Sequence, residues 1–243
     1  MSILSDVLSV LDDMVSLVLI RSCIICNAPM LDDDGFACVA CQHRIPLTHF
    51  THRADNPVEQ HFRAMLPIEH ASSLYWFVGE SQWAKVVYKF KYAGRWAMAW
   101  RMGEWLGSEL YDGGLYGDVD VVVPIPLHKR RRLMRGYNQA EMLALGVSNK
   151  LGVPYEFKAV KRVQYNESQT QKRRMERWEN VSDIFAVPKP EKLRGRHILI
   201  VDDVLTTGAT ITACAKTIYE ACEGDVRISI ATLAASPRSF GQR

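Results

Sequence analysis

The sequence predicts an α/β protein in which helices flank a parallel β-sheet and a small cysteine-rich module precedes it. Residues 198–201 are a short apolar run without polar alternation, which is typical of a strand covered on both faces of a parallel sheet, and the β-branched residues at 119–123 predict another short strand. From Ile211 to Cys222, apolar residues recur at the spacing of one helix face. Two Cys-x-x-Cys pairs between residues 23 and 41 indicate the separate module.

The cysteine pairs predict a structural zinc site. Cys23 and Cys26 form one pair, Cys38 and Cys41 form the other, and eleven residues separate the two. Each pair can present two thiolates from a tight turn, so together they complete a tetrahedral site for Zn²⁺. A redox pair and two disulfides are the alternatives, but the first leaves the second pair unexplained and disulfides are rare without a secretory signal. The other two cysteines lie on the apolar helix face and are predicted to be core.

Residues 1–20 are predicted to form an amphipathic helix that packs on the protein. Their apolar stripe runs from Leu4 to Val18, and three aspartates interrupt it. No basic segment precedes the stripe, which argues against a signal peptide, and no other apolar run reaches the length of a membrane span. We therefore expect a cytoplasmic protein without membrane insertion.

The charge is unevenly distributed along the 243 residues. The net charge is +3, and 48% of the residues are hydrophobic, which is a typical balance for a globular protein. Residues 121–177 hold thirteen Lys and Arg against four Asp and Glu, a local net charge of +9. Such a segment favours an anionic partner, although a solvated basic surface explains the same charge.

The region before residue 112 is predicted to contain one strand and two helices. An extended segment at 72–79 precedes a helix at 83–92 and a second helix at about 95–111. Between residues 89 and 101 cations are interleaved with aromatic residues, which suits base stacking and phosphate neutralisation. Amphipathic helices with an aromatic core face also explain the pattern and are the favoured interpretation, although base stacking stays open as the alternative. Residues 42–70 show no sustained period and are predicted to be a connection.

Three loops are predicted to meet at one edge of the sheet. Residues 202–208 join a strand to a helix, which is where open α/β sheets bind ligands. Residues 127–135 form a basic loop, Gly136 opens the next helix, and a further basic loop follows at 169–181. Paired acids, a Thr/Gly turn and basic loops together describe a ligand with hydroxyl groups and several phosphates. Alternatively, the two acids cap the following helix.

These motifs resemble a known family. The stretch "ILIVDDVLTTGAT" at 198–210 resembles the fingerprint of type I phosphoribosyltransferases, which bind phosphoribosyl pyrophosphate (PRPP). The stretches "VPIPLH" and "RRRLMRGYNQAE", with "QT…R..ER..NV" after them, further resemble the ComF family of competence-associated proteins, from Cys23 to about Ala234. The family loop usually written QTGLSR reads "QTQKRR" here, with Gln171 in place of glycine.

The resemblance implies a fold and a domain organisation. The fold is the type I phosphoribosyltransferase fold, a parallel sheet flanked by helices, with an N-terminal four-cysteine zinc ribbon. The implied parts are the helix at 1–20, the zinc ribbon at 21–55 and the phosphoribosyltransferase-like domain at 70–243.

The resemblance also implies ligands and site residues. Asp202 and Asp203 would contact the ribose hydroxyls as catalytic residues, and Mg²⁺ would accompany PRPP. The protein would transfer phosphoribosyl to an unknown acceptor; alternatively, it is a non-catalytic factor that binds PRPP and single-stranded DNA in DNA uptake, with competence machinery proteins as partners. The implied PRPP-binding residues are Asp202, Asp203, Val204, Leu205, Thr206, Thr207, Gly208, Ala209 and Thr210, and the implied pyrophosphate contacts are Pro126, Leu127, Arg135, Arg174 and Arg177.

Overall fold

The computed structural model describes residues 22–23, 25–30, 37–79, 81–92, 96–163 and 184–240. The chain divides into two compact units, Met1–Ile45 and Pro46–Arg243, and each is described by itself. The predicted helix at 1–20 and the predicted basic loop at 169–181 lie outside the described residues.

In the first unit, the described residues that carry the cysteines form two turns. An antiparallel bridge joins Ser22 to Pro29, and between them the backbone N–H of Asn27 donates to the carbonyl of Cys23 at 2.8 Å. The second turn is the one-turn helix α2 (Val39–Gln42), which Cys38 begins. Both turns therefore present cysteines from short hydrogen-bonded loops.

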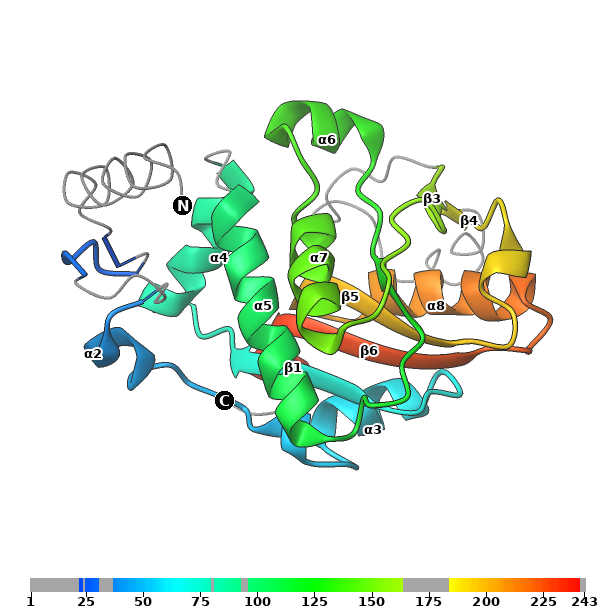
Figure 1. The fold of residues 1–243 in the computed structure, drawn as a ribbon, viewed down its shortest axis with the longest axis horizontal. Coiled ribbons are helices and arrows are strands. Elements are labelled where there is room, and N and C mark those ends of the chain that lie inside the picture. The colour runs from blue at the N-terminus through cyan, green and yellow to red at the C-terminus, as the bar shows by residue number, and fades with distance from the viewer. Residues whose placement is uncertain are drawn as a thin grey trace, which may run out of the picture. The chain divides into compact units, whose positions relative to one another are not determined.

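A parallel sheet of four strands forms the centre of the second unit (Figure 1). Its order is β1 (Ala71–Trp76), β6 (Arg227–Ala235), β5 (His197–Leu205) and β2 (Val121–Pro124). The strands are almost entirely buried, and the apolar run at 198–201 lies in β5 as predicted, whereas β6 was not predicted. A separate antiparallel pair is formed by β3 (Lys161–Arg162) and β4 (Phe185–Ala186).

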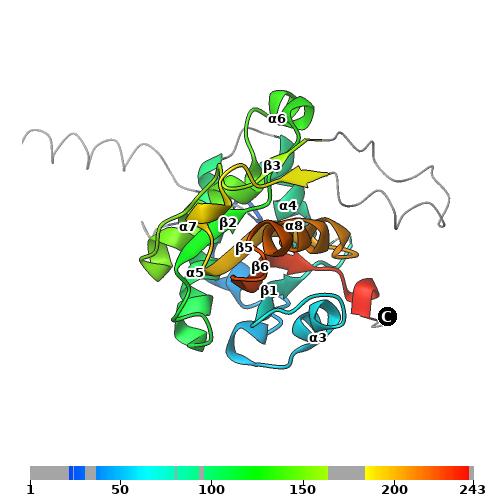
Figure 2. The same cartoon turned by 90° about the vertical axis from the view of Figure 1, so that its right-hand side faces the viewer.

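Helices cover both faces of the sheet. Helices α5 (Trp96–Gly113) and α7 (Gln139–Leu151) lie on one face and α8 (Ala209–Ala221) lies on the other, as Figure 2 shows from the side. Ile198 and Ile200 belong to the core cluster that includes apolar residues of α8. Successive strand residues point to opposite faces, so Leu199 and Val201 face the α5–α7 layer. Cys214 and Cys222 of the α8 region are fully buried, as predicted.

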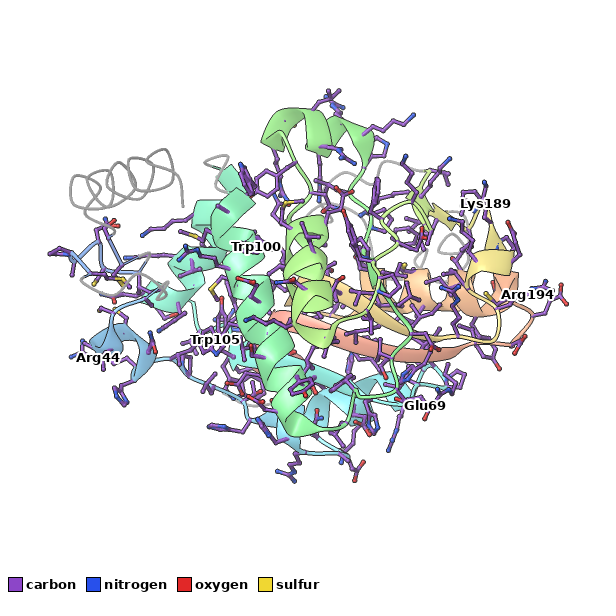
Figure 3. The ribbon with its side chains drawn as sticks, viewed as in Figure 1. Arg44, Glu69, Trp100, Trp105, Lys189 and Arg194 are labelled. Carbon is purple, nitrogen blue, oxygen red and sulfur yellow. The ribbon has the colours of Figure 1, made fainter. Side chains whose placement is uncertain are left out.

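Helices α4 (Gln82–Tyr92) and α5 agree with the two helices predicted before residue 112. Their apolar stripes are buried, and the rings of Trp83 and Trp105 pack with centroids 5.9 Å apart. Trp100 and Trp105 are labelled on α5 in Figure 3. Trp96 is 58% exposed and Tyr88 is 53% exposed, so the aromatic residues divide between core and surface.

Helices α5 and α7 pack at very short range because glycines face each other. A Cβ at Gly146 of α7 would lie 2.5 Å from the backbone nitrogen of Glu104 and closer still to the carbonyl of Trp100. A Cβ at Gly107 would lie 2.9 Å from the Cα of Val147. The two backbones therefore touch without intervening side chains.

Strand β5 extends further than predicted. The sequence predicted a loop at 202–208, but pairing with β6 continues to Leu205, which aligns with Ala235. Backbone pairing does not depend on side-chain polarity, so the strand passes through both acids. The helix-capping alternative for the acids is also wrong, because Gly208 occupies the N-cap of α8 and no side chain caps that end.

The basic segment predicted as a loop contains a helix, α6 (Lys129–Arg135). The side chain of His128 caps its start, and Gly136, with a φ of 80°, ends it rather than opening the next helix. No residue of α6 is buried. The helix therefore has no apolar face that sequence periodicity can reveal.

The predicted connection at 42–70 also contains structure. It forms the 3-10 turn η1 (Phe50–His52) and the helix α3 (Pro57–Arg63). The buried Asn56 caps α3, and its side chain also donates to the carbonyl of Ala71 at the start of β1. Two more 3-10 turns, η2 (Pro190–Lys192) and η3 (Pro237–Phe240), complete the described elements.

A chain of polar side chains, with His197 and Ser229 buried and Asp118 and Arg227 exposed, links the amino ends of β5 and β6. His197 lies between Ser229 Oγ, at 2.8 Å from its Nε2, and Asp118 Oδ1, at 2.9 Å from its Nδ1. The hydrogen bond from Arg227 is the main reason that the pKa of Asp118 lies below its usual value. These are the residue types of a hydrolase triad, but Ser229 is fully buried, so the chain is a structural network.

Across the described ranges, no helix has the length and apolarity that crossing a bilayer requires.

Candidate functional site

A cavity of about 340 Å³ lies at the carboxyl ends of β5 and β2. Its wall combines segments that are far apart in the sequence, as expected for the ligand site of an open parallel sheet. The residues that line it are Phe77, Val87, Tyr88, Ile125, Pro126, Leu127, Arg131, Arg135, Asn138, Gln139, Ala140, Arg162, Asp202, Asp203, Val204, Thr206 and Thr210.

The two acids lie side by side at the end of β5 and point to opposite faces of the sheet. Asp202 lies on the α8 side, where its charge acts on Arg162 and on Cys214. Asp203 lies on the other side. There, burial, with a contribution from Asp203, raises the pKa of Tyr137 to about 12.

Backbone groups hold one oxygen of each carboxylate. Asp202 Oδ1 accepts from the N–H of Asp203 at 2.9 Å, and Asp203 Oδ1 accepts from the N–H of Val204 at 2.8 Å. These bonds fix the carboxyl groups at the mouth of the cavity. Carboxylates in such positions can accept hydrogen bonds from ligand hydroxyls.

The turn after β5 leads directly into α8. Gly208 adopts a φ of 74°, which is favourable only for glycine, and α8 then runs for 13 residues. Thr206 and Thr207 are exposed in this turn. The first N–H groups of a helix have no partner within the helix and carry partial positive charge, so this end can bind an anion.

Helix α3 contacts the same turn, and the sequence did not predict this contact. His61 Nε2 lies 3.3 Å from the carbonyl oxygen of Thr207, and a Cβ at Gly208 would lie 2.9 Å from the same nitrogen. Glycine at 208 therefore allows His61 to approach the backbone. His61 was missed because α3 has only seven residues, too few to show a clear period.

The segment after β2 is fixed by the start of α7. Asn138 is buried, and its side chain donates to the carbonyl of Ile125 at 3.0 Å while it accepts from the N–H of Ala140 at 3.2 Å. One residue thus caps α7 and holds the chain that carries Pro126 and Leu127 into the cavity wall.

Three arginines give the cavity a cationic side. Arg131 and Arg135 come from α6, and Arg162 comes from β3. An ion pair between Arg132 and Glu141 at 3.1 Å joins α6 to α7. Figures 1 and 2 both show α6 projecting beyond the rest of the unit.

The structure brings together most of the predicted site residues. Eight of them line the cavity: Pro126, Leu127, Arg135, Asp202, Asp203, Val204, Thr206 and Thr210. Thr207, Gly208 and Ala209 lie in the adjoining turn, and Leu205 is fully buried. Arg174 and Arg177 lie outside the described residues. The sequence analysis did not assign the lining residues Phe77, Val87, Tyr88, Ile125, Arg131, Asn138, Gln139, Ala140 and Arg162 to a site.

The four cysteines of the first unit form a cluster that could hold a metal ion. Their sulfur atoms all lie within 4.8 Å of one another, and none is in a disulfide. The sulfurs of Cys26 and Cys38 are 3.8 Å apart. Tetrahedral zinc with bonds of about 2.3 Å places its sulfurs about 3.8 Å apart, so the cluster is compatible with zinc.

The thiol acidity of this cluster differs between its members. Burial acts to raise the pKa of Cys23, but backbone N–H groups, including that of Ile25, lower it to about 6. Burial, and then the neighbouring sulfurs, raise the pKa of Cys41. A cation at the centre would favour the thiolate form of all four side chains.

Comparisons with known proteins agree with this site. Residues 138–241 match the phosphoribosyl transferase domain family. Competence protein F of Haemophilus influenzae is 36% identical over 99 residues, which are 40% of this chain and 43% of that protein. The DNA utilization protein YhgH of Escherichia coli is 35% identical over 97 residues, which are 40% of this chain and 42% of that protein. The matches span less than half the length of these relatives.

A solved structure adds a distant likeness. The glutamine phosphoribosylpyrophosphate (PRPP) amidotransferase of B. subtilis aligns with 59% of this chain and 30% of its own, at 18% identity and a TM-score of 0.40. The family match, the parallel sheet and the cysteine cluster confirm the predicted fold class. Residues 138–241 thus match the phosphoribosyl transferase domain family, and the chain is similar to competence protein F over 40% of its length, in agreement with the resemblance to the ComF family.

Proposed function

We propose that the cavity binds PRPP with Mg²⁺ and that the protein transfers the phosphoribosyl group to an acceptor. The observation that carries the proposal is the polarity of the cavity. Two carboxylates and three arginines line the same cavity, whose volume is about 340 Å³. A ligand with hydroxyl groups at one end and a pyrophosphate at the other complements this arrangement.

Each part of PRPP has a matching group. The ribose hydroxyls donate to Asp202 and Asp203, and the 5′-phosphate occupies the turn Thr206–Thr210 at the start of α8. The pyrophosphate lies against the segment that carries Pro126 and Leu127, with Arg135 close by. The carboxylate and phosphate oxygens suit Mg²⁺, which would supply charge neutralisation for the leaving pyrophosphate.

The reaction is a displacement at ribose C1. The bond from C1 to the pyrophosphate oxygen breaks, a bond from C1 to the acceptor forms, and pyrophosphate leaves with the electron pair. The arginines stabilise the charge that develops on the leaving group, and the carboxylates hold the ribose in place. No side chain needs to act as a nucleophile.

The acceptor side of the cavity is apolar. Phe77 and Tyr88 line it with ring centroids 6.1 Å apart, and Val87 lies beside them. Their exposed ring surface suits an acceptor with an apolar face.

A second candidate function is non-catalytic binding of PRPP and single-stranded DNA in DNA uptake, with competence machinery proteins as partners. The supporting observation is α6, whose Lys129, Arg130 and Arg132 are exposed beside Leu133, at 86% exposure, and Met134, at 79%. Cations next to apolar side chains suit phosphates and unstacked bases. The names of the relatives, competence protein F and DNA utilization protein, agree with this candidate.

Calorimetric titration of the purified chain tests both candidates. We expect saturable binding of one PRPP per chain in the presence of Mg²⁺. At a PRPP concentration 100 times its Kd, the free energy of unfolding should rise by about 2.7 kcal/mol. A titration with single-stranded DNA, alone and in competition with PRPP, separates the candidates, because a transferase of small acceptors needs no DNA. Absence of both heat and thermal stabilisation with PRPP would rule out the proposed ligand.

We also propose that the ion in the cysteine cluster is Zn²⁺ and that it stabilises the first unit. A module of this size has too small a core to fold by burial alone, and four thiolates match zinc. Thiolates of this kind persist in a reducing compartment, so we place the protein in the cytoplasm.

Replacing Cys38 with Ser should remove the metal. Purified wild-type chain should contain about one zinc per molecule, and Cys38→Ser should contain close to none because hydroxyl is a poor zinc ligand. The first unit should then become sensitive to protease. The control is Val39→Ser at the neighbouring residue, which is 64% exposed and should keep its zinc. Full zinc content and unchanged protease resistance in Cys38→Ser would contradict the assignment.

A further inference from the structure

Two side chains in the cavity wall carry buried donors without a partner. The atoms are Gln139 Nε2 and Arg162 Nε, and within the described ranges they are the buried side-chain nitrogen and oxygen atoms that lack a hydrogen bond. Gln139 is 2% exposed. Both residues line the cavity.

Such atoms are uncommon in folded proteins. A buried donor that loses its water without gaining a partner costs about 1–3 kcal/mol, and most buried polar groups are therefore paired. Two of them in one wall indicate that a ligand supplies the missing acceptors.

The orientation of the Gln139 amide is fixed. Its Oε1 accepts from Arg135 Nη1 at 2.9 Å, and a guanidinium can only donate, so the oxygen must face Arg135. Gln139 is also the first residue of α7, directly after the buried N-cap Asn138. The amide nitrogen therefore cannot exchange places with the oxygen to find a partner.

The surroundings of Arg162 disfavour its positive charge. Burial, and then the positive charge of Arg131, lower its pKa, and Asp202 acts in the opposite direction. Its guanidinium lies over the ring of Phe185, with the central carbon 5.6 Å from the ring centroid. Arginine stays charged at neutral pH, so two cations share this part of the wall. An anion placed between them would be stabilised by both.

We propose that Gln139 and Arg162 form part of the subsite for the pyrophosphate group, with Gln139 Nε2 and Arg162 Nε donating to its oxygens. The inference rests on the proposed function, which it extends by two residues. Gln139 supplies a neutral donor of fixed direction, and Arg162 supplies charge. The ribose 5-phosphate part of the ligand is held by other groups, the acids and the start of α8.

The test compares three probes on the full chain: inorganic pyrophosphate, PRPP and ribose 5-phosphate, each with Mg²⁺. Gln139→Glu keeps the oxygen that faces Arg135 and replaces only the donor, so it should fold. Arg162→Met removes the charge, and Arg162→Lys keeps the charge but removes Nε. We expect at least a tenfold loss of affinity for pyrophosphate and PRPP in Gln139→Glu and Arg162→Met, a smaller loss in Arg162→Lys, and less than a twofold change for ribose 5-phosphate.

Two matched controls and a stability measurement exclude a merely structural role. Gln60→Glu and Arg194→Met change exposed residues, and Figure 3 shows Arg194 at the edge of the unit, before the amino end of β5. Both controls should bind all probes like wild type. Without ligand, Arg162→Met should unfold at the same temperature as wild type or higher, because it removes a half-buried cation whose Nε has no hydrogen-bond partner.

The outcomes separate this inference from the proposed function. If wild type binds PRPP and all variants bind the three probes as wild type does, the subsite is wrong and the proposed function stands. Equal losses for pyrophosphate and ribose 5-phosphate would also overturn the subsite. If wild type binds neither PRPP nor pyrophosphate, the proposed function fails and the subsite fails with it.

Discussion

The double substitution Asp202→Asn and Asp203→Asn should lower the affinity for PRPP by at least about 100-fold. The two carboxylates are the charged acceptors for the ribose hydroxyls in the proposed complex. Hydrogen bonds to charged groups contribute about 1.5–3 kcal/mol each, and a 100-fold change corresponds to about 2.7 kcal/mol. Calorimetric titration with PRPP and Mg²⁺ measures the loss directly.

The same double variant should keep its fold. Asn retains the Oδ1 atom that accepts from the N–H of the next residue at both positions. Its melting temperature should therefore shift by less than about 4 °C, which corresponds to about 1 kcal/mol for a chain of this size. Asp112→Asn with Glu220→Gln removes two exposed charges elsewhere and is the matched control. Unchanged PRPP affinity in the Asp202/Asp203 variant would remove the acids from the site.

Replacing the buried Gly146 with Val should cause a large loss of stability, because it forces the closely packed helices α5 and α7 apart. The first added carbon would lie 2.5 Å from the nitrogen of Glu104 and even closer to the carbonyl of Trp100. Both are backbone atoms, so no rotamer change can relieve the contact and the helices must separate. Overpacking of this kind costs about 1–3 kcal/mol, and the rigid neighbours place Val at the upper end of that range or above it. Chemical denaturation measures the decrease.

The control for this prediction is a glycine in open space. A Cβ at Gly79 would meet nothing within 4 Å, so Gly79→Ala should change the free energy of unfolding by less than about 0.5 kcal/mol. Helix α7 begins at Gln139 in the cavity wall, so Gly146→Val should also weaken ligand binding. A Gly146→Val protein as stable as wild type would show that α5 and α7 are less closely packed than described.

The pattern of apolar residues in the sequence predicted the strands and helices whose apolar side chains are buried. The apolar run at 198–201 and the stripe from Ile211 to Cys222 gave β5 and α8, because a sheet covered on both faces leaves no polar alternation. Helix α6 left no such trace, since none of its residues is buried and it is held by its caps and by the Arg132–Glu141 ion pair. The period of apolar residues in the sequence reveals a helix that buries one face, such as α8, but not a helix such as α6 that buries no residue.

The part of the candidate site that the sequence predicted is the part whose residue types by themselves suggest a chemistry. Paired acids followed by a Thr/Gly turn suit a ligand with hydroxyl and phosphate groups, and the structure brings Asp202, Asp203 and Thr206 into the wall of one cavity. Gln139 and Arg162 stand out only because their donors are buried without partners, which is a property of the packed structure. His61 is similar, because its contact with Thr207 joins residues that are 146 positions apart.

The opposite directions of Asp202 and Asp203 have a mechanical consequence. A ligand held by both acids lies across the end of β5, with the α7 layer on one side of it and the α8 layer on the other. Such a ligand would connect the α7 layer on one face of the sheet to the α8 layer on the other face. We therefore expect a bound ligand to restrain the helices on both faces of the sheet rather than one loop.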